Sequence, residues 1–181
     1  MCDFVAALKD KGTLKTGWGC QYGWPTTPVC GWTGVVCSSS RILKLNLGSR
    51  KLEGSIPSTI SKLELLNTLQ LESNKLTGSL PQSLATVSGL FVIRLTSNCF
   101  VGTIPDALNQ WPMLSYLSVN INRFSGTIPS FLGTLTLLRE LYMQRNSFVG
   151  TIPSSLGSLS QSLVYLRLDQ NSLTGDIPAS L

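Results

Sequence analysis

The sequence contains no histidine, and this absence excludes several kinds of catalytic and metal-binding site. Without an imidazole there is no Ser-His-Asp or Cys-His arrangement for nucleophilic catalysis, and no histidine-ligated metal. The five cysteines are not arranged in the Cys-x-x-Cys pairs that structural zinc sites commonly use. We therefore expect a chain that holds neither a metal nor a cofactor.

Charged side chains make up only 13% of the chain, and the basic ones are scattered. The net charge of +5 comes from 14 Lys and Arg against 9 Asp and Glu, and the only adjacent basic pair is Arg50-Lys51. A nucleic-acid-binding segment would show a basic run or stripe, so we expect no nucleic-acid partner. No apolar run approaches the ~20 residues of a membrane-spanning helix, so we expect no membrane contact by this segment itself.

Two marks of secreted proteins are also missing. The N-terminus has no basic segment followed by a long apolar stretch, so no signal peptide is visible. The chain contains no Asn-x-Ser/Thr acceptor for glycosylation. These absences leave three alternatives: the chain is a fragment, it is a mature form with an added methionine, or it is not secreted.

What the sequence does contain is a motif that recurs every 24 or 25 residues. Each copy has an asparagine, aliphatic residues eight, five and three positions before it, a glycine four positions after it, and a proline three positions after the glycine. The asparagines are Asn74, Asn98, Asn122, Asn146 and Asn171; the glycines are Gly78, Gly102, Gly126, Gly150 and Gly175; the prolines are Pro81, Pro105, Pro129, Pro153 and Pro178. The pattern LxxLxLxxN with this period is the signature of the leucine-rich repeat, so we predict a solenoid.

The expected fold is of the α/β class, a right-handed solenoid with a parallel β-sheet on its concave face and short 3₁₀ turns on its convex face. In this arrangement the asparagine side chain turns inward and bonds backbone groups that would otherwise be buried and unpaired. Residues 41–181 would form six repeats, of which the last is incomplete. Because an open coil end exposes apolar residues, we expect either that the chain continues or that it is a fragment.

Residues 1–40 do not follow the repeat, and we predict that they form an N-terminal cap over the first coil. Asp3 would cap a short helix with an apolar face. The residues expected to cover the coil end are Phe4, Leu8, Trp18, Trp24 and Trp32.

The sequence Gly-x-Ile-Pro within the repeat, as in Gly54–Pro57 and Gly102–Pro105, resembles the plant-type leucine-rich repeat. The segment Cys30-Gly-Trp-Thr-Gly-Val-Val-Cys37 resembles the CxWxGVxC box that precedes such repeats. Members of this family are mostly ectodomains of receptor-like kinases and receptor-like proteins, together with secreted polygalacturonase inhibitors. The resemblance implies a Cys30–Cys37 disulfide; a Cys2–Cys20 bridge would be a second, with free thiols in a reducing compartment as the alternative. Cys99 has no evident partner.

Strand phase predicts which side chains face outward from the concave sheet: those six, four, two and one positions before each asparagine. Tyrosine and arginine gather there, and these residues often anchor interfaces because they combine large contact area with directed hydrogen bonds. The alternative is that strands favour tyrosine anyway and that exposed arginine keeps a sheet soluble. The candidate ligand-binding residues are Arg94, Tyr116, Glu140, Tyr142, Arg145, Tyr165 and Arg167.

The solenoid predicts a ligand- or protein-binding module. The family resemblance implies that it is the extracellular recognition part of a receptor-like protein or receptor kinase held at the plasma membrane in the full-length protein. Its partners would be a peptide or protein ligand and, in addition, a co-receptor. The alternatives are a secreted inhibitor of a cell-wall-degrading enzyme and a non-secreted interaction scaffold. We do not expect an enzyme: the exposed carboxylates Glu72 and Glu140 would lie three coils, about 14 Å, apart, too far for paired acid–base work.

Overall fold

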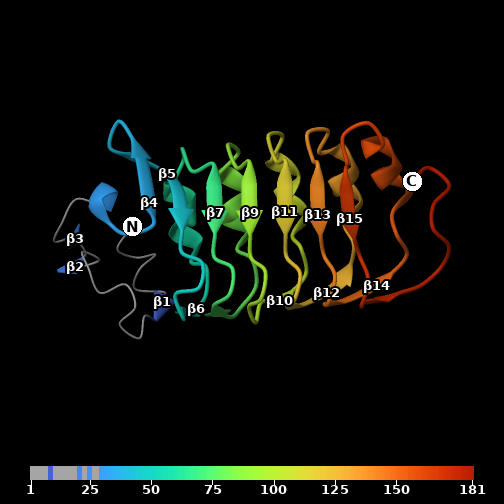
Figure 1. Ribbon diagram of the computed structural model, residues 1–181, viewed down its shortest axis with the longest axis horizontal. Helices are drawn as coiled ribbons and strands as arrows, with labels where there is room; N and C mark the ends of the chain where they lie inside the picture. Colours follow the sequence, from blue (N-terminus) through green and yellow to red (C-terminus); the bar gives the residue numbers. More distant parts are fainter. Residues whose placement is uncertain (1–7, 10–19, 22–23, 26–28) are drawn as a thin grey trace.

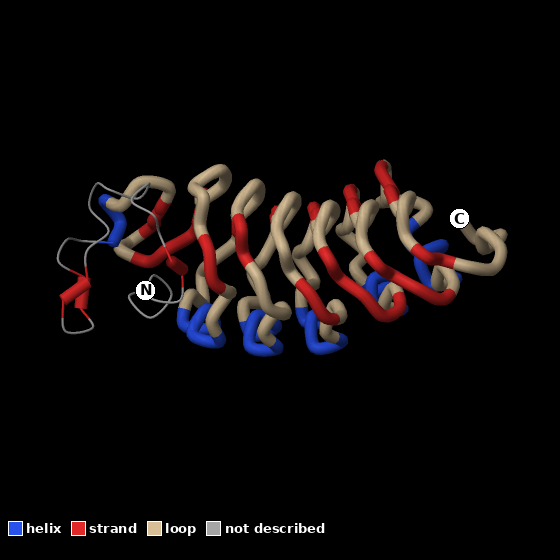
Figure 2. Tube along the Cα trace, turned by 90° about the horizontal axis from the view of Figure 1, so that it is seen from below, coloured by secondary structure: helices blue, strands red, loops and turns tan. Residues whose placement is uncertain are grey.

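The computed structural model describes residues 8–9, 20–21, 24–25 and 29–181. Residues 41–181 form a solenoid in which successive coils lie side by side in sequence order (Figure 1). Two rows of strands and one row of short turns run along its length (Figure 2), and each of the first five coils contributes one segment to each row.

The main sheet lies on the concave face and holds seven strands in the order β15-β13-β11-β9-β7-β5-β4. Its strands are β4 (Val35–Ser38), β5 (Arg41–Asn46), β7 (Thr68–Gln70), β9 (Val92–Arg94), β11 (Tyr116–Ser118), β13 (Glu140–Tyr142) and β15 (Tyr165–Arg167). All neighbours are parallel except β4 and β5, which are antiparallel. Tyr116 pairs with Val92 on one side and Glu140 on the other, so the register expected from the repeat is confirmed.

The convex row consists of 3₁₀ turns, as predicted, and the described residues contain no α-helix. The turns of this row are η2 (Ser58–Lys62), η3 (Gln82–Thr86), η4 (Asp106–Gln110), η5 (Ser130–Thr134) and η6 (Ser154–Leu159). A further turn, η1 (Val29–Gly31), precedes the first coil and lies apart from that row (Figure 2). A proline stands directly before each of η2 to η6 in extended backbone, for example Pro105 with φ −66°. Proline fixes φ and lacks an N–H, so it sets the bend at which the convex turn begins.

A second set of short strands runs along the coils, and the sequence patterns above did not predict it. One sheet has the order β10-β12-β14-β16 and another β1-β6-β8. Their strands are β1 (Leu8–Lys9), β6 (Glu53–Gly54), β8 (Lys75–Leu76), β10 (Val101–Gly102), β12 (Arg123–Thr127), β14 (Ser147–Gly150) and β16 (Ser172–Leu173). Neighbouring strands in these sheets are parallel except β1 and β6, which are antiparallel. We call these two sheets together the lateral sheet, because its strands run along the lower edge of the solenoid in Figure 1.

The core runs through the whole stack and is made of the repeat's aliphatic residues. Leu69, Ile93 and Leu141, the central residues of three concave strands, are completely buried. A row of phenylalanines lies behind the lateral sheet, with the ring centroids of Phe100 and Phe124 6.0 Å apart. Each coil therefore buries its apolar side chains against the coil before it and the coil after it.

The predicted asparagine ladder is present. The Nδ2 group of Asn122 donates to the carbonyl of Leu95 in the preceding coil at 2.9 Å and to that of Val119 in its own coil at 3.1 Å. Its Oδ1 accepts from the backbone N–H of Phe100 at 3.0 Å. The same bonds recur at the other four repeat asparagines. Each asparagine thus satisfies backbone groups of two coils that could not otherwise find partners.

The repeat glycines place neighbouring coils in close contact. Gly126 has φ +79°, which is strained for other residues. A Cβ at that position would also lie 2.7 Å from the Cγ2 methyl of Thr103 in the preceding coil. Thr127 lies over Gly150, and Thr151 over Gly175, in the same way. The methyl group of each threonine therefore packs against a glycine of the next coil. The threonine residues as a whole remain exposed, on the outer side of the lateral sheet.

The N-terminal segment departs from the expected helix where it is described. Leu8, predicted on the apolar face of a helix, lies in β1, which pairs antiparallel with β6. An amide and a carbonyl on the open edge of β6 are paired in this way, which explains why an extended segment is favoured there. The rest of the predicted helix, with Phe4 and Trp18, lies outside the described residues. Short strands β2 (Cys20–Gln21) and β3 (Trp24–Pro25) form a separate antiparallel pair.

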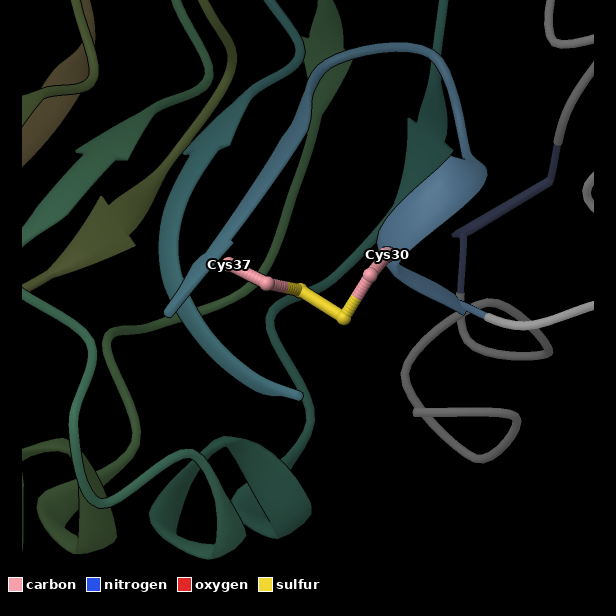
Figure 3. The surroundings of a disulfide bond; sticks show 2 residues. All are labelled: Cys30 and Cys37. Carbon is pink, nitrogen blue, oxygen red and sulfur yellow. A yellow bond between two sulfur atoms is a disulfide. The ribbon is translucent and has the colours of Figure 1, made fainter. Parts of the chain in front are cut away.

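The disulfide between Cys30 and Cys37 is present and joins η1 to β4 (Figure 3). Trp32, within the loop that it closes, is 2% exposed and packs in the core. That residues 1–40 cap the first coil stays a prediction. Cys99 is a free, half-exposed thiol. Cys2 and the side chain of Cys20 lie outside the described residues, so their bridge stays a prediction.

Candidate ligand-binding face

The parallel register brings the predicted site residues into two columns on the concave face. One column runs through Val92, Tyr116, Glu140 and Tyr165, and the other through Arg94, Ser118, Tyr142 and Arg167. Neighbours in a column are one strand spacing, about 4.8 Å, apart. Side chains from coils that are distant in sequence can therefore act together on this face.

Four of the predicted residues form one contiguous cluster, which we call the tyrosine cluster: Arg94, Tyr116, Tyr142 and Glu140. The guanidinium carbon of Arg94 lies 4.5 Å from the ring centroid of Tyr116, the geometry of a cation–π contact. The rings of Tyr116 and Tyr142 are tilted by 44° with centroids 5.6 Å apart. The hydroxyl of Tyr142 donates to Oε2 of Glu140 at 2.9 Å. The cluster crosses three strands, β9, β11 and β13.

The hydroxyl of Tyr142 is held in its neutral form. Burial, followed by the hydrogen bond to Glu140 and the negative charge of that carboxylate, raises the pKa of Tyr142 from 10.0 to about 12. Each of these effects disfavours a phenolate beside a carboxylate. Tyr142 therefore serves as a hydrogen-bond donor throughout the physiological pH range.

Four polar residues of the same face are buried or half-buried, and we call them the polar floor: Thr96, Ser118, Asn120 and Gln144. Ser118 is 2% exposed although it points to the outer side of the sheet. The hydroxyls of Thr96 and Ser118 contact each other, and both reach Oδ1 of Asn120, at 2.7 and 2.6 Å. The sequence phase placed these residues on the face, but it contained no sign that large neighbours would bury them.

Two buried polar atoms at this site have no hydrogen-bond partner among the described residues. They are Nε of Arg94 and Oε1 of Gln144, and Gln144 is only 8% exposed. A buried polar atom without a partner costs free energy, and so one that persists calls for an explanation. A ligand that supplies an acceptor to Arg94 and a donor to Gln144 would remove both costs.

The other three predicted residues lie on the same face but outside the tyrosine cluster. Arg145 donates through Nε to Oε1 of Gln170 at 2.9 Å. Arg167 forms an ion pair with Asp169 on its own coil, and the hydrogen bond from Arg167 lowers the pKa of the Asp169 carboxyl below its ordinary value. Tyr165 is 56% exposed on β15. These side chains extend the face toward the C-terminal coil, where the charge of Arg167 is paired with that of Asp169.

Ile121 also belongs to this face, and its backbone conformation is unusual. It precedes the ladder residue Asn122, has φ +55° and is 39% exposed. A β-branched residue seldom adopts a left-handed backbone, because its side chain clashes with the main chain. Ile121 therefore places an exposed apolar side chain on the concave face, although the backbone conformation at this position disfavours a β-branched residue.

The described residues show no group of three or more acidic, cysteine or histidine side chains arranged to hold a metal ion. Nor does any helix within the described ranges have the length and apolar character needed to cross a membrane. The chemistry available on the face is hydrogen bonding, ion pairing and aromatic contact.

Comparison with known proteins finds the same type of repeat. The family model Leucine Rich Repeat matches residues 65–87, 137–159 and 162–181. Phytosulfokine receptor 1 of Arabidopsis thaliana is 34% identical over 70 residues, which is 37% of this chain and 6% of the receptor. The chain thus spans a small part of that relative's length.

Solved structures resemble nearly the whole chain. One is the Arabidopsis receptor kinase HAESA in complex with the peptide hormone IDA and the co-receptor SERK1, with TM-score 0.86 and 31% identity over 98% of this chain and 30% of that one. Another is a plant ice-binding protein, with TM-score 0.83 and 29% identity over 99% of this chain and 58% of that one. Both likenesses extend over the solenoid described above.

Proposed function

We propose that this chain, a leucine-rich-repeat domain of the plant type, is the extracellular ligand-binding part of a receptor that acts at the plasma membrane. In this proposal the ligand is a peptide or protein held on the concave face, and a co-receptor is a second partner. The domain recognises its ligand and makes or breaks no bond.

The tyrosine cluster is the observation that carries the proposal. It offers two aromatic rings, a half-buried guanidinium and a half-buried carboxylate on one rigid sheet. Aromatic and arginine side chains are the residues that most often dominate binding energy in interfaces. A similar solenoid, that of HAESA, has been solved with a peptide hormone and a co-receptor, which supports a peptide as the ligand.

Selection from a displayed random-peptide library against the immobilised chain tests the proposal. We expect enriched peptides whose affinity falls at least about tenfold for a Tyr116→Ser/Tyr142→Ser variant, since truncating an interface anchor costs 2 kcal/mol or more. The matched control is Arg123→Gln, an exposed substitution on the lateral sheet. Enriched peptides that bind the tyrosine variant as well as the parent would refute the concave face as the site, provided that circular dichroism shows both variants folded.

A second candidate function rests on the lateral sheet. Ser79, Thr103, Thr127 and Thr151 stand at equivalent exposed positions in successive coils. The methyl groups of the three threonines are packed against the glycine of the next coil, so hydroxyl and methyl groups repeat at about 4.8 Å without intervening charge. Such a rigid, uncharged array could match a regular lattice of water, and one similar solenoid is an ice-binding protein.

Growth of ice grains in a frozen protein solution tests this second function. We expect the chain to slow grain growth and Thr127→Lys to abolish the effect, because a charged side chain would break the array. Thr134→Lys, at an exposed position of η5, serves as the matched control. Grains that grow as fast as in an inert protein solution would rule the function out.

A further inference from the structure

A cavity of about 530 Å³ lies between the fifth and sixth coils, at the edge of the solenoid opposite the lateral sheet. Its walls come from the two loops that join the convex turns η5 and η6 to the concave strands β13 and β15 (Figure 1). This volume is within the range of about 300–1,000 Å³ that is usual for ligand sites. The cavity is separate from the tyrosine cluster, none of whose residues line it.

The cavity lies where two neighbouring loops differ in length. In the fifth coil, two residues separate the core residues Leu135 and Leu138. In the sixth coil, three residues, 160–162, separate Leu159 from Leu163. The N–H of Leu138 donates to the carbonyl of Leu135, three residues earlier, but the N–H of Leu163 donates to a carbonyl four residues earlier. Because the loops are unequal, they cannot stack residue on residue, and a cavity remains between them.

One charged side chain and two apolar ones define the chemistry of this cavity. Arg139 is the only charged residue among the described residues that line it. Its guanidinium is exposed and forms no ion pair or hydrogen bond within the part of the chain that the structure describes. Leu137 and Val164, 46% and 59% exposed, line the same cavity. A guanidinium binds carboxylates through two parallel hydrogen bonds, and the apolar walls favour an aliphatic group beside the carboxylate.

We infer that this cavity is a recognition pocket for a carboxylate with an aliphatic side chain next to it, both carried by the peptide ligand. The carboxylate pairs with Arg139, and the aliphatic side chain packs against Leu137 and Val164. Arg139 directly precedes Glu140, the first residue of β13, and Val164 directly precedes β15. A peptide that lies over these two strands of the concave face therefore reaches the pocket at their N-terminal ends. This inference rests on the proposed function, of which it specifies one part of the ligand.

Titration of the chain with small peptides, followed by amide chemical shifts, tests the inference. The probe is acetyl-Leu-Asp-amide. The comparison peptides are acetyl-Leu-Asn-amide, which lacks the charge, and acetyl-Gly-Asp-amide, which lacks the aliphatic side chain. We expect the probe to shift the amides of Leu137 and Ser162 with a dissociation constant of about 1 mM or tighter. It should bind at least about threefold more tightly than either comparison peptide, since an exposed ion pair and a partly buried aliphatic side chain each add modestly to affinity.

Two variants provide the second measurement. Arg139→Glu should transfer the preference from the probe to acetyl-Leu-Lys-amide, whereas Arg123→Glu on the lateral sheet should leave it unchanged. Deletion of Gln161 makes the loop of the sixth coil as short as that of the fifth. This deletion should close the cavity and weaken binding of the probe about threefold or more, and circular dichroism checks that the variant is folded.

The outcomes separate the pocket from the proposed function. Absence of probe binding, equal affinity for the probe and either comparison peptide, or an unchanged preference in Arg139→Glu would overturn the inference. If library peptides still depend on Tyr116 and Tyr142 in that case, the proposed function stands and only the pocket fails. Probe binding in the cavity, together with library peptides that ignore both tyrosines, would support the pocket and refute the tyrosine cluster as the main binding site.

Discussion

The backbone conformation of single residues in this solenoid is fixed by their position in the coil. The residue directly before each ladder asparagine, or before Arg50 in the first coil, has a left-handed backbone. Its φ lies between +55° and +57° in all six coils. The residues are Ser49, Ser73, Ser97, Ile121, Arg145 and Gln170. Five are unbranched at Cβ and tolerate this conformation better than isoleucine does. Strain at an exposed apolar residue of the concave face makes Ile121 a candidate ligand contact.

Replacing Ile121 by asparagine should therefore stabilise the fold while weakening ligand binding. We expect the free energy of unfolding to rise by about 1 kcal/mol, because asparagine adopts the left-handed backbone at little cost. Urea unfolding of the two proteins measures this change, and Ser97→Asn provides a control with a smaller expected gain. An unchanged or lower stability of Ile121→Asn would show that the side chain makes compensating contacts.

Replacing a ladder asparagine should have the opposite effect: it should lower the stability of the fold. Asn122→Ala removes the bonds to Leu95, Val119 and Phe100 and leaves those backbone groups without partners. We expect a loss of roughly 3 kcal/mol or more, since each buried group left unpaired costs about 1–3 kcal/mol. Thermal unfolding measures it, and Asn109→Ala, at an exposed position of η4, should change stability by less than about 0.5 kcal/mol. Similar values for the two variants would contradict the role of the ladder.

Among the elements, those with a strict apolar period could be predicted from the sequence and the others could not. The concave strands and convex turns were predicted because Leu69, Ile93 and their equivalents repeat at fixed spacing. The lateral strands were missed because each is only two to five residues long and alternates a core residue such as Phe124 with polar ones. Leu8 was assigned to a helix from local sequence, whereas the structure pairs its backbone with β6, a long-range contact that local patterns do not contain.

The burial of Tyr142 and its hydrogen bond to Glu140 on the same strand, β13, predict how the ionisation of this tyrosine responds to pH. Because the pKa of Tyr142 is raised to about 12, its neutral form is favoured by folding. This contribution to stability is complete below pH 10 and is lost as the pH rises from 10 to 12. Ultraviolet absorbance of tyrosinate measures the titration, and Tyr142→Phe should remove the step with the highest pKa. Glu140→Gln should lower the pKa of Tyr142; a pKa that stays at about 12 would show that burial alone accounts for it.

At the scale of the whole molecule, each coil contacts chiefly its two neighbours, so stability is expected to vary along the solenoid. The repeat period was sufficient to predict this architecture from the sequence. The tyrosine cluster was predicted only in part: column membership follows from the period, but the choice of which side chains touch depends on rotamers. That is why Arg94 and Tyr116 are in contact while Arg167 turns to Asp169.

Loss of the disulfide should therefore weaken one end of the molecule more than the other. The Cys30→Ser/Cys37→Ser variant should lose about 2–3 kcal/mol, the chain-entropy value for so short a loop. Hydrogen exchange should show the largest loss of amide protection near Leu45 in the first coil and the smallest near Leu141. An equal loss at both positions would mean that the solenoid unfolds as a single cooperative unit.

The asparagine ladder also limits how such a chain can change its length. Asn146 bonds Val119, 27 residues earlier, and every other rung spans 27 or 28 residues. The one extra residue of the last full period is taken up on the convex side, where η6 has six residues, and Glu140 still faces Tyr165. Duplication or deletion of an entire period would preserve every rung, whereas a shift of a few residues within a concave strand would break two. Solenoids of this kind can therefore gain or lose whole coils, and each added coil would lengthen the concave face by one strand spacing, about 4.8 Å.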